Sequence, residues 1–504
     1  MANYTFFKCK FTLTEQTAPI SADPELYQQW LDRLALNRPQ LCAEELLKSM
    51  EAFNSMDIDV NVRQKLLLLY LQKIKKIYPS LQVEMERTEG LGHEITRRAA
   101  SVMVRLYTAL FHGLRIMLVQ RIKKPPLLNR EQNKIELLSR VLQAAKEVIV
   151  TCGRFHVVVP VNIWLYCHEI CRFAQEEKLL DKPYKNLILN ELYIQLLLVG
   201  MIPHSRMNAD SFDWLRQHLF SCASSVNILT LDDQSEKPNG FYFDITADHP
   251  PRFFPRPPIA DAMLWRKVDC QRIIAAFSKT IEGKDAEGKA YNDDVMLLRL
   301  VTIEWSYSAR RRCPREKLQE PTWFQSRMGS VWELLRTEWQ PGDVLVGGRF
   351  TTHPCLMSKI DISEMGCGLT GDPQGVSIQI GEIAVVRSES EASWKLGVIR
   401  WVMLNGNGQN INCGLEFLTD DAQAVEVRPV IGSGNAYFTP ALQLPANPKQ
   451  GKGSVLVLTG RVFSRLREFI VRYQDGTERA VRLSRLSSQT SFYQFAEFLD
   501  SEDL

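Results

Sequence analysis

The fold is decided by a succession of short runs, which read GDVLVGGRF (342–350), LMSKIDIS (356–363), VSIQIG (376–381), EIAVVRS (382–388), WKLGVIRWVML (394–404) and INCGLEFL (411–418). Runs of this length, rich in β-branched residues and separated by glycine-marked turns, are typical of β-strands. Strands that follow one another through tight turns pair as antiparallel neighbours, and this many can close on themselves without an unpaired edge. We therefore expect a small antiparallel β-barrel here.

A second β series follows the first. From residue 431 the sequence contains ALQLP (441–445), GSVLVLTGRVF (453–463) and REFIVRYQDGTERAVRLSRL (467–486), with Asp475-Gly476 as a strong hairpin turn. Upstream of the barrel, VNILTLDD (226–233) and GFYFDIT (240–246) predict short strands, and LWRKVDCQRIIAAFSKTI (264–281) predicts a helix. These stretches predict a small β domain at the end of the chain and a mixed connector before the barrel.

The first half of the chain has a helical pattern. From about 25 to 225 the apolar residues recur at helical spacing, and prolines at Pro79, Pro125-Pro126 and Pro160 are expected to separate seven or eight helices. The predicted fold class is therefore α+β multidomain: an all-helical region, an antiparallel barrel and a second small β domain. The expected domains are a helical bundle (1–225), the connector (226–305), the barrel (306–430) and the small β domain (431–504).

Composition limits the function. The 61 Lys and Arg residues and 58 Asp and Glu residues leave a net charge of only +3, which does not indicate a general polyanion binder. The basic clusters also lack the interleaved aromatic residues of a nucleic-acid surface, so we expect no nucleic-acid partner. Any anion site must be local.

Membrane and export signals are weak. The most apolar stretch, 187–203, contains Asn190, Glu191 and Gln195, which favours a buried helix over a membrane span. The first fifteen residues hold no apolar run typical of a signal peptide. The 11 cysteines are odd in number and scattered, which is typical of reduced thiols. We expect a cytoplasmic protein.

Two local motifs stand out in the barrel region. Arg310-Arg311-Arg312-Cys313-Pro314-Arg315 contains RxxxR, and Asp361-Ile362-Ser363-Glu364-Met365-Gly366 contains DxSxxG at the end of a strand. RxxxR also occurs at 252–256 and 461–465, so it is the order of the two motifs around barrel strands that is informative. In that order, and with Trp394, Gly397, Arg400 and Gly414 downstream, residues 306–430 resemble the PilZ domain family.

The resemblance implies a function and a ligand. PilZ domains bind the bacterial second messenger cyclic-di-GMP, so the chain is expected to be a receptor that needs no other cofactor. Arginine suits this ligand because its guanidinium pairs with phosphate and with guanine O6 and N7, while a carboxylate can accept from guanine N1–H and N2–H2. The expected ligand-binding residues are Arg310, Arg311, Arg312, Arg315, Asp361, Ser363, Gly366 and Arg400. An unidentified protein partner is expected to bind the helical region.

An alternative reading stays open. Arg315 and Asp361 are 46 positions apart, longer than is common in the family, because TWFQSRMGSVWELLRTEW (322–339) reads as an inserted strand and amphipathic helix. The arginine run could be a solvated boundary and DxSxxG an ordinary turn. The chain would then be a non-enzymatic scaffold with a barrel that binds no nucleotide. The helix around Trp332 is expected to pack on the barrel, either as a core cap or as a relay of ligand occupancy.

Catalytic and metal chemistry find little support in the sequence. His168-Glu169 and His93-Glu94 lack the second histidine of a zinc-binding HExxH helix, and no GxSxG nucleophile turn occurs. Cys167, His168 and Cys171 lie close together without a second ligand pair nearby, so packing residues are the preferred interpretation. We expect no catalytic residue and no metal site.

Overall fold

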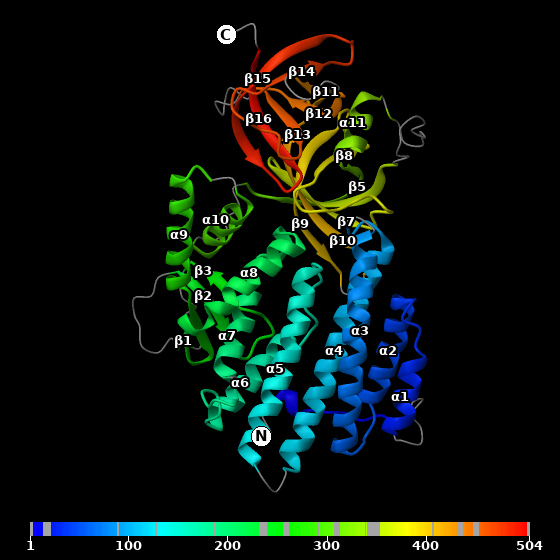
Figure 1. Ribbon diagram of the computed structural model, residues 1–504, viewed down its shortest axis with the longest axis vertical. Helices are drawn as coiled ribbons and strands as arrows, with labels where there is room; N and C mark the ends of the chain where they lie inside the picture. The colour runs from blue at the N-terminus through cyan, green and yellow to red at the C-terminus, as the bar shows by residue number, and fades with distance from the viewer. Residues whose placement is uncertain are drawn as a thin grey trace. The chain divides into compact units, whose positions relative to one another are not determined.

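The computed structural model divides the chain into two compact parts, drawn in Figure 1. We call Met1–Arg87 with Arg98–Arg310 the helical unit, and Thr88–Arg97 with Arg311–Leu504 the barrel unit. The residues that the structure describes are 4–13, 22–87, 90–125, 129–185, 188–230, 239–255, 262–289, 292–306, 313–337, 339, 353–405, 408–430, 437–446 and 453–500.

Helices make up the described part of the chain up to residue 225. They are α1 (Pro24–Arg33), α2 (Pro39–Asn54), α3 (Val60–Arg87), α4 (Glu94–Lys123), α5 (Arg130–Arg154), α6 (Ile163–Glu176), α7 (Leu189–Gly200) and α8 (Ala209–Ser221), with short turns η1 (Thr5–Phe7), η2 (His204–Arg206) and η3 (Ala223–Ser225). Local sequence sets their ends: the Asp23 side chain accepts from the backbone N–H of Glu25, and Pro24 is the first helical residue. The predicted helical region is confirmed.

Helix α3 corrects one prediction, because it runs through Pro79 where we expected a break. Proline removes one helical hydrogen bond, at a cost of about 3 kcal/mol. On either side of it, Ile77, Leu81 and Met85 are buried at helical spacing. The burial of this apolar stripe keeps the helix continuous.

Two apolar helices bear on the membrane question. Helix α7 contains the most apolar stretch of the sequence and lies buried, with Leu196, Leu197 and Leu198 fully inaccessible. Among the described helices, α4 alone has the length and composition of a membrane span, and 72% of its most apolar window is buried inside the protein. Core helices have the same composition, so this signal is weak.

A four-stranded sheet completes the helical unit. Its strands are ordered β1-β4-β2-β3, and the elements are β1 (Asn227–Thr230), β2 (Gly240–Asp244), β3 (Arg252–Phe254), η4 (Ala262–Leu264), β4 (Trp265–Asp269), α9 (Gln271–Ala286) and α10 (Asp293–Ser306). The prediction of one helix from 264 was wrong in its first part, because residues 265–268 pair with β2 and residues 266–269 pair with β1 as a strand. The helix begins only after Asp269, whose side chain accepts from the N–H of Gln271.

The first barrel is closed in the order β10-β7-β6-β5-β8-β9. Its elements are β5 (Glu316–Ser326), α11 (Met328–Arg336), β6 (Cys355–Ser363), β7 (Gly366–Gly371), β8 (Ile383–Ser388), β9 (Lys395–Leu404) and β10 (Ile411–Thr419). Strand β5 lies between β6 and β8, so it is an integral strand of the barrel wall. The prediction that this strand belongs to an insertion was therefore wrong. Between β5 and β6, the described residues add the helix α11 to this wall.

One expected barrel strand does not form, and another lies outside the described residues. Residues 376–379 are irregular backbone, buried at 376–378 and held by the bonds Gly375 N–H to Gly92 O and Gly381 N–H to Ile399 O. Gly92 is needed here, because a Cβ on it would lie 1.9 Å from the carbonyl oxygen of Val376. The predicted strand 342–350 falls outside the described residues.

The second barrel is closed in the order β11-β12-β13-β16-β15-β14. Its strands are β11 (Gln423–Pro429), β12 (Thr439–Leu444), β13 (Val455–Thr459), β14 (Glu468–Arg472), β15 (Glu478–Gln489) and β16 (Tyr493–Asp500). The Asp475-Gly476 turn joins β14 to β15 as predicted, with Gly476 at φ +83°. The predicted fold class, helices followed by two antiparallel β domains, is confirmed.

Candidate functional site

The predicted ligand-binding residues fall on neighbouring strands of the first barrel. Arg315 immediately precedes β5, Asp361 and Ser363 end β6, Gly366 begins β7, and Arg400 lies on β9. Arg310, Arg311 and Arg312 lie outside the described residues. The structure therefore places five of the eight predicted residues.

Arg315 and Asp361 form an ion pair. Arg315 Nη1 lies 2.6 Å from Asp361 Oδ1, and the two side chains are 26% and 23% exposed. The Asp361 carboxylate leans over Gly368 of β7, its partner across the strands, where a Cβ would lie 2.9 Å from Oδ1. Two residues separated by 46 positions thus meet on one face of the barrel, with their polar ends accessible to solvent.

Ser363 and Gly366 have local structural roles. Ser363 Oγ donates to the carbonyl oxygen of Gly366 at 3.2 Å, which fastens the turn between β6 and β7. A Cβ on Gly366 would lie 2.1 Å from the carbonyl oxygen of Leu415, so the close approach of β7 and β10 requires glycine. This contact, and not a special turn conformation, explains the glycine of the DxSxxG motif.

Arg400 lies on β9, which β10 separates from β7 in the barrel. It occupies an irregularity between β9 and β10, where Trp401 pairs with Gly414 but Ile399 pairs with Leu415. Its Nε lies 2.5 Å from the Glu416 carboxylate, and the arginine side chain is 46% exposed. Since Glu416 pairs with Gly366, Arg400 is held beside the DxSxxG turn.

Trp401, which the sequence analysis did not identify, lies on the same face of the barrel. Gly368 pairs with Gly414, and Gly414 pairs with Trp401, so Asp361 and Trp401 stand on either side of two glycines. The Trp401 indole lies over Gly414, where a Cβ would be only 1.9 Å from Nε1. We call Gly366, Gly368 and Gly414 the glycine floor. The signal in the sequence was three glycines in two facing strands, but it takes the pairing register to show what they face.

Cysteine and histidine side chains of the helical unit are packing residues. Cys167 and Cys171 are buried in α6, and both ring nitrogens of His168 are occupied, by Tyr193 Oη at 2.7 Å and by the carbonyl oxygen of His249 at 3.0 Å. Burial lowers the pKa of His168 to about 4, so its ring is neutral. Within the described ranges, no group of three or more His, Cys, Asp or Glu side chains is arranged to hold a metal ion.

Comparison with known families adds to this geometry. The model of the cyclic-di-GMP receptor FimW, N-terminal domain, matches residues 25–234, and that of the cyclic-di-GMP receptor FimW, middle PilZ domain, matches residues 350–424. The second match begins after Arg315 and β5, so it does not cover the RxxxR motif. No curated protein matches the chain.

The first barrel, with DxSxxG at its β6–β7 turn and this family match, is a PilZ domain. The two matches together cover more than half of the chain, and the protein belongs to the FimW family.

Proposed function

We propose that this protein binds cyclic-di-GMP on the face of the first barrel that carries Arg315, Asp361 and Trp401. The observation that carries the proposal is the Arg315–Asp361 ion pair beside the glycine floor. The family is named for a cyclic-di-GMP receptor, which agrees with this chemistry. The proposal assigns binding to this face and no reaction.

The side chains suit a ligand with two guanines and two phosphates. Asp361 can accept from guanine N1–H and N2–H2, and the guanidinium groups of Arg315 and Arg400 can donate to phosphate or to guanine O6 and N7. The glycine floor makes room for the Asp361 carboxylate and the Trp401 indole, and Trp401 offers a surface for stacking. Each part of the face thus meets a different part of the ligand.

Separating Arg315 from Asp361 to admit a ligand costs little free energy. Both members of the Arg315–Asp361 pair are about one quarter exposed, and partly exposed pairs of this kind contribute about 0–1 kcal/mol. A guanine that bonds to both side chains replaces this interaction with more hydrogen bonds than it removes. The ion pair therefore holds the two groups in place for the ligand without blocking it.

Isothermal titration calorimetry tests the proposal. The full chain is titrated with cyclic-di-GMP and with cyclic-di-AMP, which lacks the guanine edge. We expect Arg315→Ala and Asp361→Ala each to weaken cyclic-di-GMP binding by roughly tenfold or more, since each loses a charge-assisted hydrogen bond. Asp361→Ala should also lose the preference for guanine.

A matched control comes from the second barrel. Arg482→Ala removes a similarly exposed cation from its pair with Glu468, on strands remote in the topology from β6, and should leave affinity unchanged. Absence of heat with the parent chain would support the scaffold alternative and refute the binding proposal.

We also propose that the helical unit binds a protein partner in response to the ligand. The N-terminal family match over 25–234 supports a separate role for this part. All eleven cysteines of the whole chain are free thiols, which supports a cytoplasmic setting. Co-precipitation with and without cyclic-di-GMP, repeated with Asp361→Ala, should show a partner whose recovery depends on ligand in the parent alone.

A further inference from the structure

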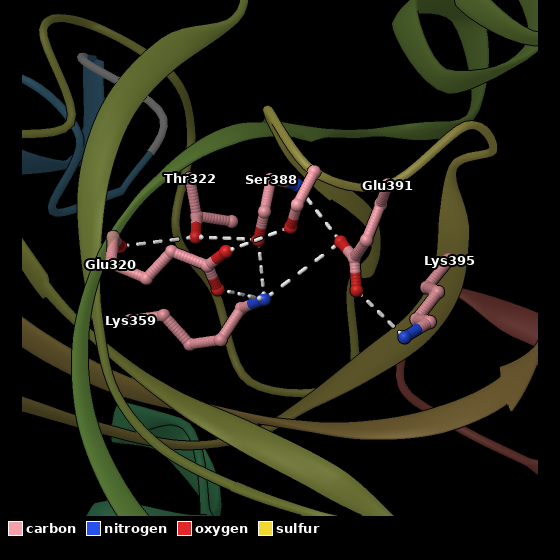
Figure 2. Close-up of polar contacts among 7 residues, drawn as sticks. Glu320, Thr322, Lys359, Ser388, Glu391 and Lys395 are labelled. Carbon is pink, nitrogen blue, oxygen red and sulfur yellow. Dashed lines mark hydrogen bonds and ion pairs between the residues drawn. The ribbon is translucent and has the colours of Figure 1, made fainter.

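A buried lysine lies next to the proposed site in sequence but on the other side of the barrel wall. Figure 2 shows Lys359 of β6 within a group of polar side chains from β5, β8 and β9. Its Nζ lies 3.0 Å from the Glu320 carboxylate, 2.5 Å from Ser388 Oγ and 3.7 Å from the Glu391 carboxylate. The Lys359 side chain is only 2% exposed.

The charges around this ammonium are balanced. Burial opposes the ionisation of Glu320, but the hydrogen bond from Lys359 is among those that outweigh it and lower the pKa of Glu320. Burial opposes the ionisation of Glu391 too, and the bond from Lys395 at 2.7 Å helps to lower the pKa of Glu391. The lowered pKa values keep both carboxylates ionised, and the two glutamates share one network with Lys359 and Lys395 (Figure 2).

The network lies against a bulge that sets the direction of Asp361. Residues two apart in a regular strand face the same side, yet Lys359 pairs with the fully buried Leu369 while Asp361 pairs with Gly368. The register shifts between them, so that Ile360 is the extra residue. This bulge turns Lys359 toward the interior and Asp361 toward the ligand face.

The neighbouring strand is irregular at the same level. On β5 the register shifts between Lys317, which pairs with Asp361, and Glu320, which pairs with Lys359. Arg315 lies two residues before Lys317. The Lys359–Glu320 ion pair therefore fastens β6 to β5 on one side of both irregularities, and the Asp361–Arg315 pair lies on the other side.

We propose that Lys359 is a positioning residue for the nucleotide site: it fixes the paired irregularities of β5 and β6 that aim Asp361 at the guanine edge. This inference rests on the proposed binding of cyclic-di-GMP. Lys359 itself does not contact the ligand, because its side chain lies inside the barrel.

A double-mutant cycle on the full chain tests this role. Cyclic-di-GMP affinity is measured for the parent, Lys359→Met, Asp361→Ala and the double variant. A positioning role predicts that Lys359→Met weakens binding roughly tenfold in the parent but changes it little once Asp361 is absent. It also predicts that Lys359→Met reduces the preference for cyclic-di-GMP over cyclic-di-AMP.

Two further variants keep the test decisive. Glu320→Gln keeps the shape of the network and removes the charge that ties Lys359 to β5, so it should weaken binding in the same Asp361-dependent way even if Lys359→Met does not fold. Lys395→Met removes a cation from the same network without touching β5 or β6, and should leave affinity unchanged.

The outcomes separate the two proposals. Equal losses with and without Asp361, or no loss at all, would overturn the positioning role while the parent still binds ligand. A parent chain that gives no heat with cyclic-di-GMP would overturn the binding proposal and this inference together.

Discussion

The two barrels of this protein share an architecture and differ in how they are filled. Each closes from six described antiparallel strands. The hydrophobic core of the second consists of Val425, Val427, Ala441, Leu456, Leu458, Phe469, Val471, Val481, Leu483, Ala496 and Phe498, and its described buried polar side chains, Gln489, Thr490 and Gln494, are uncharged. The first places an ammonium group, Lys359, among its buried residues.

Sulfur also distinguishes the first barrel. Cys355, Cys367 and Cys413 are buried on its strands, and burial raises the pKa of the Cys355 and Cys367 thiols to about 12. Such thiols stay neutral and pack as small apolar groups. Lys359, by contrast, has polar partners on three sides, namely Glu320, Ser388 and Glu391.

The contrast between the two barrels indicates which features of a closed sheet can carry a ligand-binding site. A regular strand presents alternating side chains at fixed positions, and register shifts interrupt this alternation in both barrels, in the second between Leu483 and Arg485 and between Leu486 and Ser488. Bulges and glycines break this regularity, as at Ile360 and Gly368, and the polar network stabilises the broken wall from inside. The proposed ligand face of the first barrel therefore depends on the buried polar side chains behind it.

The largest expected effect on stability comes from a substitution in the apolar core of the second barrel. Leu483 is fully buried in the apolar core, and Leu483→Ala should lower the free energy of unfolding by about 2–5 kcal/mol. Calorimetric unfolding measures this loss. Cyclic-di-GMP affinity below the unfolding range should stay at the parent value, and a clear change in affinity would show that the barrels do not divide stability and binding as we infer.

The next effect lies where the barrels meet. Glu382 precedes β8 of the first barrel, is 3% exposed, and accepts a hydrogen bond from Tyr493 Oη of the second. Burial raises the pKa of Glu382 to about 7, and the bond from Tyr493 and the nearby charge of Arg327 offset this only in part. An unfolded chain has the usual value near 4.5.

The sign of the pH dependence follows from these values. Between pH 4.5 and 7 the folded state keeps a proton that the unfolded state has lost, so stability falls as pH rises through this window, by about 3 kcal/mol in all. Glu382→Gln keeps the acceptor for Tyr493 and should remove this fall. Unfolding measured at pH 4 and pH 8 should show the variant more stable than the parent only at pH 8; an equal pH dependence would contradict the assignment.

Much of this fold could be predicted from local patterns. Glycine turns and β-branched runs marked most barrel strands, and Asp475-Gly476 marked its hairpin. Local patterns were wrong where tertiary burial outweighs propensity: Pro79 remains inside α3 because the stripe around it is buried, and Trp265–Asp269 is a strand because it pairs with β2.

The site was less accessible to sequence reasoning. The motifs correctly brought Arg315 and Asp361 to one barrel, but the roles of Trp401 and Lys359 depend on register. A strict two-residue period puts Lys359 and Asp361 on the same face, and only the bulge at Ile360 separates them. Bulges arise from the pairing of distant strands, so no local sequence pattern predicts the bulge at Ile360.

The smallest expected effect concerns α11, which packs against both barrels. Met328, Val331 and Leu334 are buried in one cluster with Ile383 of the first barrel and Leu442 of the second. Trp332 Nε1 donates to the carbonyl oxygen of Val425 at 2.7 Å. Trp332→Phe keeps an aromatic ring and loses this bond, so the free energy of unfolding should fall by about 1 kcal/mol.

A matched substitution makes that small effect interpretable. Trp323 also lies partly buried against this cluster, but within the described residues its Nε1 has no hydrogen-bond partner. Trp323→Phe removes the same atoms and an unsatisfied donor, so it should cost less than Trp332→Phe. If Trp332→Phe leaves stability near the parent value but weakens cyclic-di-GMP binding or its effect on a partner, α11 is a relay. A loss of stability with unchanged affinity identifies it as a cap that joins the two barrels.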